Sequence, residues 1–222
     1  MERVLEPEVM DTAEEAETYD AMDHSEVNHA FVQRFLELGG GGRVLDVGCG
    51  PGHVPLLLVA LDPAVEVVGV DLSREMLRIA EEHRAVSPHG GRVSFQLGDA
   101  KALPFPDASF DAVMSNTILH HVPDPVPFLR ECGRVVRPGG ALLVRDLFRP
   151  ASEAEVDALV ARHAAAAPPR ARELFRASLC AALTPEELRE AAREAGLAEV
   201  EVVIDTDRHM SLQRSASDAS TG

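Results

Sequence analysis

Three glycines at alternate positions follow directly on a short apolar run, and an acid stands just before them. Residues 44–52 read Val-Leu-Asp-Val-Gly-Cys-Gly-Pro-Gly, with Asp46 two positions ahead of Gly48. Where a buried parallel strand turns into a helix, glycine supplies positive φ and lets a ligand approach the main chain. A carboxylate beside this turn would repel a pyrophosphate and attract an ammonium group. The pattern therefore predicts a site for a nucleotide-like ligand that carries an amino group.

The spacing of these glycines argues against a dinucleotide site. The dinucleotide fingerprint needs glycine at the first, third and sixth positions, and counting from Gly48 the sixth position is His53. A tight strand-to-helix turn without any ligand would also explain a glycine triplet on its own. The residues at the ends of the later strands decide between these interpretations.

A second acid stands at the end of the next expected strand. Residues 66–70 are mostly apolar and lead into Asp71, about twenty residues beyond the glycines, where a carboxylate can accept hydrogen bonds from two ribose hydroxyls. Asp71 could instead cap the following helix, but Ser73 fills that role as well. Asp46 and Asp71 together indicate an adenosine compound that bears an amino acid group, and S-adenosylmethionine fits this description.

The order of the motifs resembles that of class I S-adenosylmethionine-dependent methyltransferases, and in its later segments their ubiquinone and menaquinone branch. The resemblance covers about half of the chain and rests on the glycine turn, Asp71, Gly98-Asp99-Ala100, Leu103-Pro104-Phe105 and Arg137-Pro138-Gly139-Gly140. It implies that Asp99 accepts from the adenine amino group, that the Ala100 amide reaches a ring nitrogen, and that Asn116 lies near the methionine end. The cofactor-binding residues expected in total are Asp46, Gly48, Cys49, Gly50, Gly52, Asp71, Leu72, Met76, Asp99, Ala100 and Asn116.

The elements that must position these residues alternate between strand and helix. This pattern predicts an α/β fold, a Rossmann-like seven-stranded and mostly parallel sheet with helices on both faces and an antiparallel last strand. A Pro-Gly-Gly turn should precede the fifth strand, because proline ends the helix before it and paired glycines permit a reversal. The expected strands cover residues 44–47, 66–70, 92–97, 110–114, 141–144, 198–204 and 208–212.

Around the sheet we expect appendages rather than a second full domain. Helical spacing over residues 12–38, which begin with a Thr12 and Glu15 capping box, predicts an amino-terminal helical lid. The complete division is a lid over 1–42, an S-adenosylmethionine-binding core over 43–146, a helical insertion over the substrate pocket at 147–183, a carboxyl-terminal helix and strands completing the sheet at 184–214, and a disordered tail at 215–222.

Charge and cysteine content limit the partners and the compartment. The net charge is -16 and Lys101 is the only lysine, whereas binding to nucleic acid needs clustered Lys and Arg. We therefore expect a small-molecule acceptor and no polynucleotide. No apolar stretch reaches the length of a membrane span, no basic secretion signal opens the chain, and the three cysteines lack Cys-x-x-Cys spacing. A cytoplasmic protein with free thiols is the resulting expectation.

Two adjacent histidines follow the fourth expected strand and are the candidate catalytic residues. His120 and His121 are placed to remove a proton from an oxygen or nitrogen acceptor, although methyl transfer depends mainly on positioning. Both could instead be structural or exposed to solvent. A metal site built from them and Asp124 is not expected, because neighbours in sequence rarely converge on one ion. Arg145 and Arg149 could grip an anionic acceptor or form ion pairs that tie the insertion to the sheet.

The sequence as a whole predicts an S-adenosylmethionine-dependent methyltransferase that acts on a small molecule. The alternatives are a non-catalytic S-adenosylmethionine-binding regulatory or partner subunit, and an aminopropyl-type transferase on the same sheet. Fold and cofactor do not determine which atom receives the methyl group. The acceptor, the need for a base and the oligomeric state therefore stay open at this stage.

Overall fold

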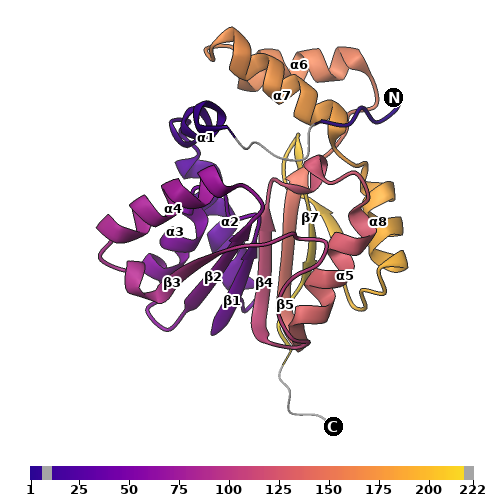
Figure 1. The fold of residues 1–222 in the computed structure, drawn as a ribbon. Coiled ribbons are helices and arrows are strands. Elements are labelled where there is room, and N and C mark those ends of the chain that lie inside the picture. The colour runs from indigo at the N-terminus through magenta and orange to yellow at the C-terminus, as the bar shows by residue number, and fades with distance from the viewer. Residues whose placement is uncertain (7–11, 218–222) are drawn as a thin grey trace.

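A seven-stranded sheet lies at the centre of the structure, a computed structural model that describes residues 1–6 and 12–217 (Figure 1). The strand order is β3-β2-β1-β4-β5-β7-β6, and β7 alone runs antiparallel to its neighbours. The predicted mostly parallel sheet with an antiparallel last strand is confirmed. Its strands are β1 (Arg43–Val47), β2 (Glu66–Asp71), β3 (Val93–Leu97), β4 (Phe110–Asn116), β5 (Val136–Leu147), β6 (Glu201–Ile204) and β7 (His209–Arg214).

Helices cover both faces of this sheet and a further group lies beyond its carboxyl edge. On one face are α2 (Ser25–Glu37), α3 (His53–Leu61) and α4 (Arg74–Val86), and on the other are α5 (Pro125–Val135) and α8 (Pro185–Glu194). Figure 1 shows α1 (Ala13–Asp20), α6 (Glu153–His163) and α7 (Pro169–Ala181) above the ends of the strands. Two short 3-10 helices, η1 (Gly90–Arg92) and η2 (Leu119–His121), precede β3 and follow β4.

The interior of β1 is mostly apolar because both of its faces are covered. In β1, Val44 packs into the core beneath α2 and α3, while Leu45 and Val47 pack into the core beneath α5 and α8. All three side chains are fully buried. A strand with two buried faces reads as a continuous apolar run, and the buried Asp46 is the exception that the site uses.

The segment with helical spacing over residues 12–38 forms two helices, α1 and α2. Thr12 does cap the first helix, with its hydroxyl accepting from the Glu15 amide at 3.2 Å. The break lies at residues 21–24, where the Asp23 carboxylate accepts from the amide of Ser25 at 3.0 Å. A short polar side chain that bonds its neighbouring amide offers the backbone an alternative to the helix.

The Pro-Gly-Gly segment also differs from its expectation. It lies inside β5 as a bulge rather than before the strand as a turn. Val136 pairs with Phe110 and Ala141 pairs with Ala112, so the residues between Val136 and Ala141 protrude from the ladder. Gly139 has φ of +72° there, a value that favours glycine. Because Val136 still pairs with β4, the strand continues through a segment whose local sequence favours a turn.

Residues 1–6 connect the insertion to the loop after β4. The Val4 amide donates to the carbonyl of Cys180 in α7 at 3.1 Å. The Arg3 guanidinium donates to the Ala181 carbonyl at 2.5 Å and to the Val122 carbonyl at 2.9 Å. The insertion has its own apolar cluster of Leu147 with side chains from α6 and α7. It is therefore a small helical layer held to the sheet partly by the start of the chain.

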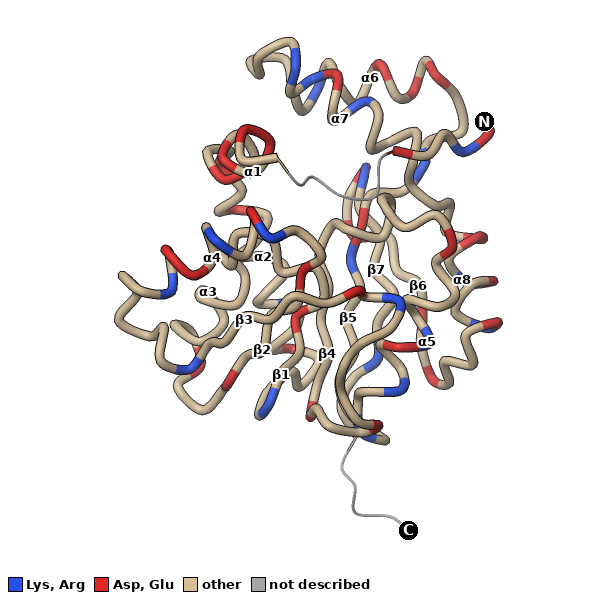
Figure 2. Tube along the Cα trace, viewed as in Figure 1, with Lys and Arg blue, Asp and Glu red and all other residues tan. Residues whose placement is uncertain are grey.

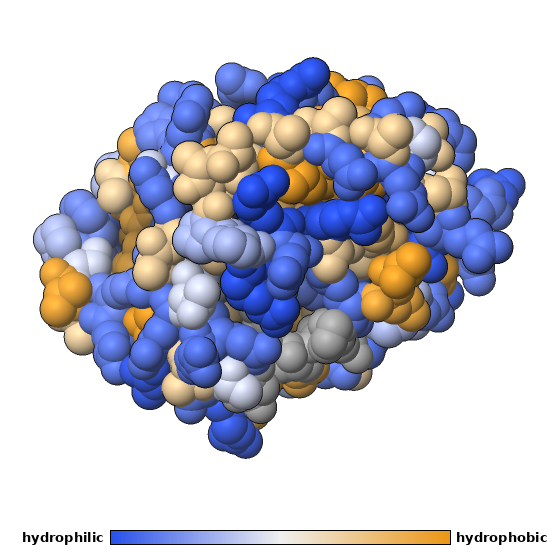
Figure 3. All heavy atoms as spheres, turned by 90° about the horizontal axis from the view of Figure 1, so that it is seen from above, coloured by the Kyte–Doolittle hydropathy of each residue, from blue (hydrophilic) through white to orange (hydrophobic). Residues whose placement is uncertain are grey.

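The surface is mixed in charge and polarity. Lys and Arg are interspersed with Asp and Glu along the tube, and acids gather on α1 (Figure 2). Seen from above the carboxyl edge, hydrophilic side chains predominate and hydrophobic ones are scattered (Figure 3). Within the described ranges, no helix is both long and apolar enough to cross a membrane. Of the expected tail, Ala216 and Ser217 donate to the carbonyls of Leu38 and Gly139, and residues 218–222 lie outside the described residues.

Candidate functional site

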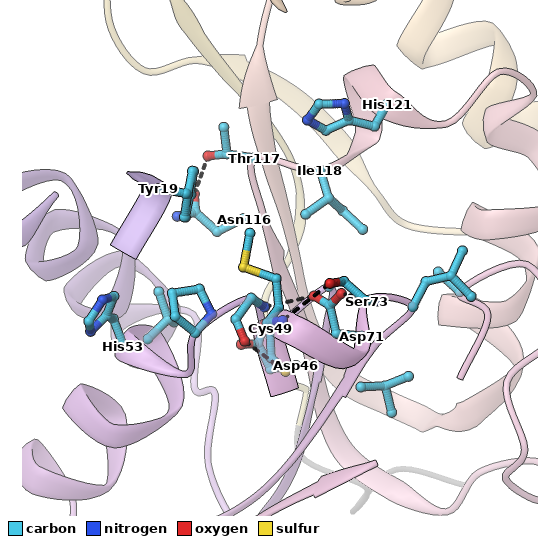
Figure 4. A pocket seen from close by; sticks show the side chains of 18 of the residues that line it. Tyr19, Asp46, Cys49, His53, Asp71, Ser73, Asn116, Thr117, Ile118 and His121 are labelled. Carbon is cyan, nitrogen blue, oxygen red and sulfur yellow. Dashed lines mark hydrogen bonds between the residues drawn. The ribbon is translucent and has the colours of Figure 1, made fainter. Parts of the chain in front are cut away.

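A pocket opens where the carboxyl ends of β1, β2 and β4 meet, close to the point at which the strand order reverses between β1 and β4 (Figure 4). Open parallel sheets place ligands at this position. Its empty volume, which includes solvent at the open mouth, is about 1110 Å³. Ten of the predicted cofactor residues line it: Asp46, Gly48, Cys49, Gly50, Asp71, Leu72, Met76, Asp99, Ala100 and Asn116.

Asp46 is a buried carboxyl group at the floor of this pocket, with 2% of its surface exposed. Burial and the nearby Asp71 carboxylate raise the pKa of Asp46 to about 8. Among the residues that the structure describes, none donates a hydrogen bond to it. A buried carboxylate without a donor is costly, and a cation placed beside it would remove much of that cost. Asp46 is therefore suited to receive a positively charged group of a ligand.

The glycine turn leaves space where a ligand would lie against the main chain. Gly48 and Gly50 have φ of +76° and +51°. A methyl group on Gly50 would meet no other atom within 4 Å, so it would project into the open pocket, whereas on Gly48 it would collide with Ile118. The neighbouring Cys49 thiol is buried, which raises its pKa and keeps it neutral. The turn provides close access to the backbone and no nucleophile.

Asp71 supports the glycine turn and still offers acceptor capacity to the pocket. Its two carboxylate oxygens accept from the Gly50 amide at 2.8 Å and from the Ser73 amide at 2.9 Å. Each carboxylate oxygen has a second lone pair. Capping of α4, the alternative role considered for Asp71, is carried out by Ser73, whose hydroxyl accepts from the Met76 amide at 3.1 Å. Asp71 thus holds the turn and remains able to accept hydroxyl donors.

Asp99 lines the pocket just after the end of β3, and Lys101 engages it through one oxygen. Its Oδ1 accepts from the Lys101 amide at 2.8 Å and lies 3.0 Å from Lys101 Nζ. Burial opposes ionisation of Asp99, but these bonds from Lys101 outweigh it and lower the pKa of the carboxyl. Asp99 is therefore an ionised acceptor at the third strand end, next to the pocket-lining Ala100.

Asn116 and Thr117 form a polar corner at the end of β4, beside Tyr19 (Figure 4). Thr117 has φ of +62°, which is strained for a β-branched residue. Its amide donates to the Arg145 carbonyl at 2.8 Å and its hydroxyl to Asn116 Oδ1 at 3.1 Å. Tyr19 brings the lid helix α1 to the pocket, and burial followed by the Asp71 and Asp146 carboxylates raises the pKa of Tyr19 to about 12. The Tyr19 hydroxyl consequently stays protonated.

The two candidate histidines occupy different environments. His121 lines the pocket beyond Ile118, whereas His120 is buried behind it with 3% exposure. His120 Nδ1 lies 2.7 Å from Asp146 Oδ1, and its amide donates to Asp146 Oδ2 at 2.8 Å. Burial lowers the pKa of His120, but the Asp146 carboxylate outweighs this and raises it above the ordinary value. The two rings lie 4.1 Å apart, and Glu6 Oε2 is 3.4 Å from His121 Nδ1.

Two of the predicted site residues, Gly52 and His120, do not line the pocket. Gly52 is the residue before α3, with φ of +80°, and a side chain there would strike Phe95 and Ala80. It permits close packing of helix on sheet. Arg149 makes ion-pair and carbonyl contacts, donating to the Glu187 carboxylate at 2.5 Å and to the Ala182 carbonyl at 2.8 Å.

Several residues of the pocket carried no recognisable signal in the sequence. His24 and Asn28 reach it from the segment before α2 and from α2, and His53 from the start of α3. Asn28 Oδ1 accepts from Asn116 Nδ2 at 3.5 Å, across 88 positions of the chain. Their side chains could have been found only by knowing how α1 and α2 pack over the strand ends.

Comparison with known proteins places the glycine turn within a family. The sequence model of a family described as a methyltransferase domain matches residues 45–144. The 27-O-demethylrifamycin SV methyltransferase of Amycolatopsis mediterranei is 36% identical over 162 residues, which cover 73% of this chain and 56% of that protein. The chain thus spans little more than half the length of this relative.

Two solved structures are similar over most of the chain. Phosphoethanolamine N-methyltransferase 2 of Haemonchus contortus, solved with phosphomonomethylethanolamine and S-adenosylhomocysteine, is 25% identical with a TM-score of 0.63, covering 81% of this chain and 38% of that chain. The (4+2)-cyclase SpnF is 27% identical with a TM-score of 0.60, covering 81% of this chain and 58% of that chain. The second protein is named as a cyclase, so this fold alone does not determine the reaction.

Proposed function

Residues 45–144 of this chain are a class I S-adenosylmethionine-dependent methyltransferase domain, and from this premise we propose that the protein transfers a methyl group from S-adenosylmethionine to a small-molecule acceptor. One arrangement carries the proposal. Asp46, Asp71 and Asp99 stand at the ends of three adjacent strands and line one pocket. They match the three polar parts of this cofactor, namely its amino group, ribose and adenine.

Asp46 is the residue that favours this cofactor over an uncharged nucleoside. Its carboxyl is buried, with a pKa of about 8 and no hydrogen bond from the described residues. An ammonium group beside it would form a charge-assisted hydrogen bond and bring the carboxyl to its ionised form. A pyrophosphate in the same place would add a like charge to a group already reluctant to ionise.

The remaining polar contacts fit the adenosine part. Asp71 accepts from the amides of Gly50 and Ser73, and a carboxylate offers about four acceptor sites, which suits it to bind ribose hydroxyls as well. Both bonds from Lys101 to Asp99 use Oδ1, so its second oxygen is positioned to accept from an exocyclic amine. Leu72 and Met76 would contact the base between these acids.

The acceptor would enter between the end of β4 and the lid helix. S-Adenosylmethionine supplies, when bound, a methyl carbon already activated by a sulfonium, so positioning of the acceptor is the main task of the protein. We assign the role of base to His121, because its ring lines the pocket. His120 would position His121, with its own ring held by Asp146 at 2.7 Å. Tyr19 remains protonated and would donate to the acceptor or the cofactor.

Two observations support a class of acceptor, namely the assigned base and the name of the relative at 36% identity. A hydroxyl needs to lose its proton for methylation, and His121 lines the pocket with the Glu6 carboxylate 3.4 Å from its Nδ1. The relative at 36% identity is named for methylating an oxygen of a rifamycin. We therefore take a hydroxyl-bearing small molecule as the first acceptor class to test.

The test begins with cofactor binding, which requires no knowledge of the acceptor. Calorimetry should show S-adenosylmethionine and S-adenosylhomocysteine binding and NAD not binding. Asp71→Ala should abolish most of this affinity, and Glu66→Ala, at the exposed start of the same strand, serves as the matched control. Tight NAD binding without affinity for either adenosyl compound would refute the assignment. Mass spectrometry of metabolite extracts incubated with labelled cofactor then identifies the methylated product.

We also place this activity in the cytoplasm. The support is that Cys49, Cys132 and Cys180 are all buried and unpaired, and proteins of oxidising compartments more often pair their cysteines. Cell fractionation with an antibody against the chain tests the assignment.

A further inference from the structure

Asp20, His53 and His83 bring polar atoms from three helices together beside the mouth of the pocket. Asp20 is the last residue of α1, His53 the first of α3, and His83 lies in the last turn of α4. Asp20 Oδ1 is 2.8 Å from His53 Nε2, and Asp20 Oδ2 is 3.4 Å from His83 Nε2. One ligand atom of each residue lies within 4.8 Å of the others.

Hydrogen bonding accounts for this cluster only if a positive charge lies within it. His83 Nδ1 lies 2.9 Å from the Pro51 carbonyl, which requires the proton on Nδ1. A neutral His83 ring then directs the lone pair of Nε2 toward a carboxylate oxygen, so that two acceptors face each other. Asp20 Oδ1 is buried and accepts no hydrogen bond from the described part of the chain, although His53 Nε2 is close. A positive charge between the three side chains would satisfy all of these atoms.

We propose that Asp20, His53 and His83 bind a divalent transition-metal ion, with zinc as the best fit. Zinc takes imidazole nitrogens and carboxylate oxygens in tetrahedral sites, and three protein ligands leave a fourth position open. The ligands come from separate helices, so each approaches from its own direction. The Pro51 carbonyl fixes the tautomer and orientation of His83, as backbone acceptors do for metal-ligating histidines.

The ion would join the lid helix to the body of the protein. Asp20 follows Tyr19, which lines the pocket, and His53 also lines it. A bound ion would hold α1 against α3 and α4, and with it Tyr19 over the cofactor. Binding of the metal and of the cofactor should therefore favour each other. The metal site itself does not depend on the proposed methyl transfer.

A second cluster with similar geometry must be separated from this one. Glu6, His120 and His121 also bring ligand atoms within 4.8 Å of one another. His120 is already held by Asp146 at 2.7 Å, and the cluster belongs to the proposed acceptor site. A Glu6→Gln variant removes its carboxylate and leaves the Asp20 cluster intact.

The experiment is zinc titration of the tag-free full chain after removal of metals by chelation. Calorimetry should give one zinc ion per chain at the Asp20 cluster, and cobalt substitution should give the visible absorption of a tetrahedral site. His83→Gln and Asp20→Asn should each weaken zinc binding at least about tenfold. His29→Gln, at an exposed position of α2, and Glu6→Gln should leave this binding unchanged.

The possible outcomes differ for each variant. Absence of stoichiometric zinc binding would overturn the proposal, as would equal affinity in the parent, His83→Gln and Asp20→Asn chains, provided that circular dichroism shows all of them folded. Loss of binding in Glu6→Gln alone would also overturn it, by assigning the ion to the other cluster. Affinity for S-adenosylhomocysteine, measured on metal-free protein, tests the proposed function independently.

Discussion

The buried Asp46 carboxyl leads to a quantitative prediction for Asp46→Asn. Its pKa is raised from 3.8 to about 8 in the folded chain. A raised carboxyl pKa means that the folded state binds the proton more tightly, so stability from this group is complete below pH 4 and is lost as pH rises toward 8. Each pH unit within that window lowers the free energy of unfolding by about 1.4 kcal/mol. By pH 7 the group has cost the ligand-free protein about 4 kcal/mol.

An amide at this position removes that cost and introduces a smaller one. An unpaired buried amide costs about 1 kcal/mol, so Asp46→Asn should raise the free energy of unfolding at pH 7 by about 3 kcal/mol. Urea denaturation at pH 5, 6 and 7 should show the difference between variant and parent growing by about 1.4 kcal/mol per unit. Glu66→Gln, exposed at the start of β2, should show no such dependence. A difference independent of pH would refute the reasoning.

Asp46→Asn should weaken cofactor binding, although it should stabilise the fold. Pairing of Asp46 with the amino group of S-adenosylhomocysteine should ionise a carboxyl that is mostly protonated at pH 7, so binding should release about one proton. Calorimetry in buffers of different ionisation enthalpy measures this release. Asp46→Asn should abolish it and weaken binding about 10- to 100-fold, the loss of one charged hydrogen bond. A variant that is both more stable and equally tight in binding would exclude the amino-group contact.

Three further substitutions test the neighbouring contacts. Asp71→Ala removes the acceptor of the Gly50 amide together with the ribose contact, so the affinity for S-adenosylhomocysteine in calorimetry should fall about 100-fold; a change below threefold would contradict the ribose role. Gly50→Ala should lower the free energy of unfolding by only about 1–2 kcal/mol, since a methyl there meets no atom in the free protein. The same methyl group should block the cofactor, so unimpaired binding would contradict a close approach of the cofactor to the main chain. Asp146→Asn leaves the buried His120 without its ionised partner, so urea denaturation should show the free energy of unfolding lowered by about 3 kcal/mol. A decrease below about 0.5 kcal/mol, which is typical of an ordinary surface substitution, would argue that the pair is structurally unimportant.

The parts of the site that sequence reasoning found share one property. Asp46 lies within β1, Asp71 ends β2 and Asp99 follows β3 after one glycine, and the carboxyl ends of these parallel strands meet at one edge. Local sequence therefore determined both the strand and the place of its acid. The same logic predicted the mostly parallel sheet and the antiparallel β7, because alternating strands and helices leave few topologies.

The parts that were missed depend on contacts between distant segments. The pairing of His120 with Asp146 spans 26 positions, and the bonds of Arg3 to Ala181 span 178. No local pattern signals either. The bulge inside β5 has the same cause, because the pairing of Val136 with Phe110 overrides the turn that Pro-Gly-Gly would otherwise form. Sequence periodicity describes an element, but its ends depend on the partner it meets.

The bonds of the first residues bear on how the chain reaches its folded state during synthesis. Val4 pairs with Cys180, and Arg3 spans from Ala181 to Val122. Domains fold as their residues leave the ribosome, yet Arg3 has no partner in α7 until Ala181, 178 positions further along the chain, has been made. Strands β1 to β5 are made before α7, so the acceptor end of the pocket should close later than these strands. A nascent chain halted before α7 would then already contain the glycine turn of the cofactor site. In that chain Arg3 could not yet join α7 to the segment that carries His120 and His121.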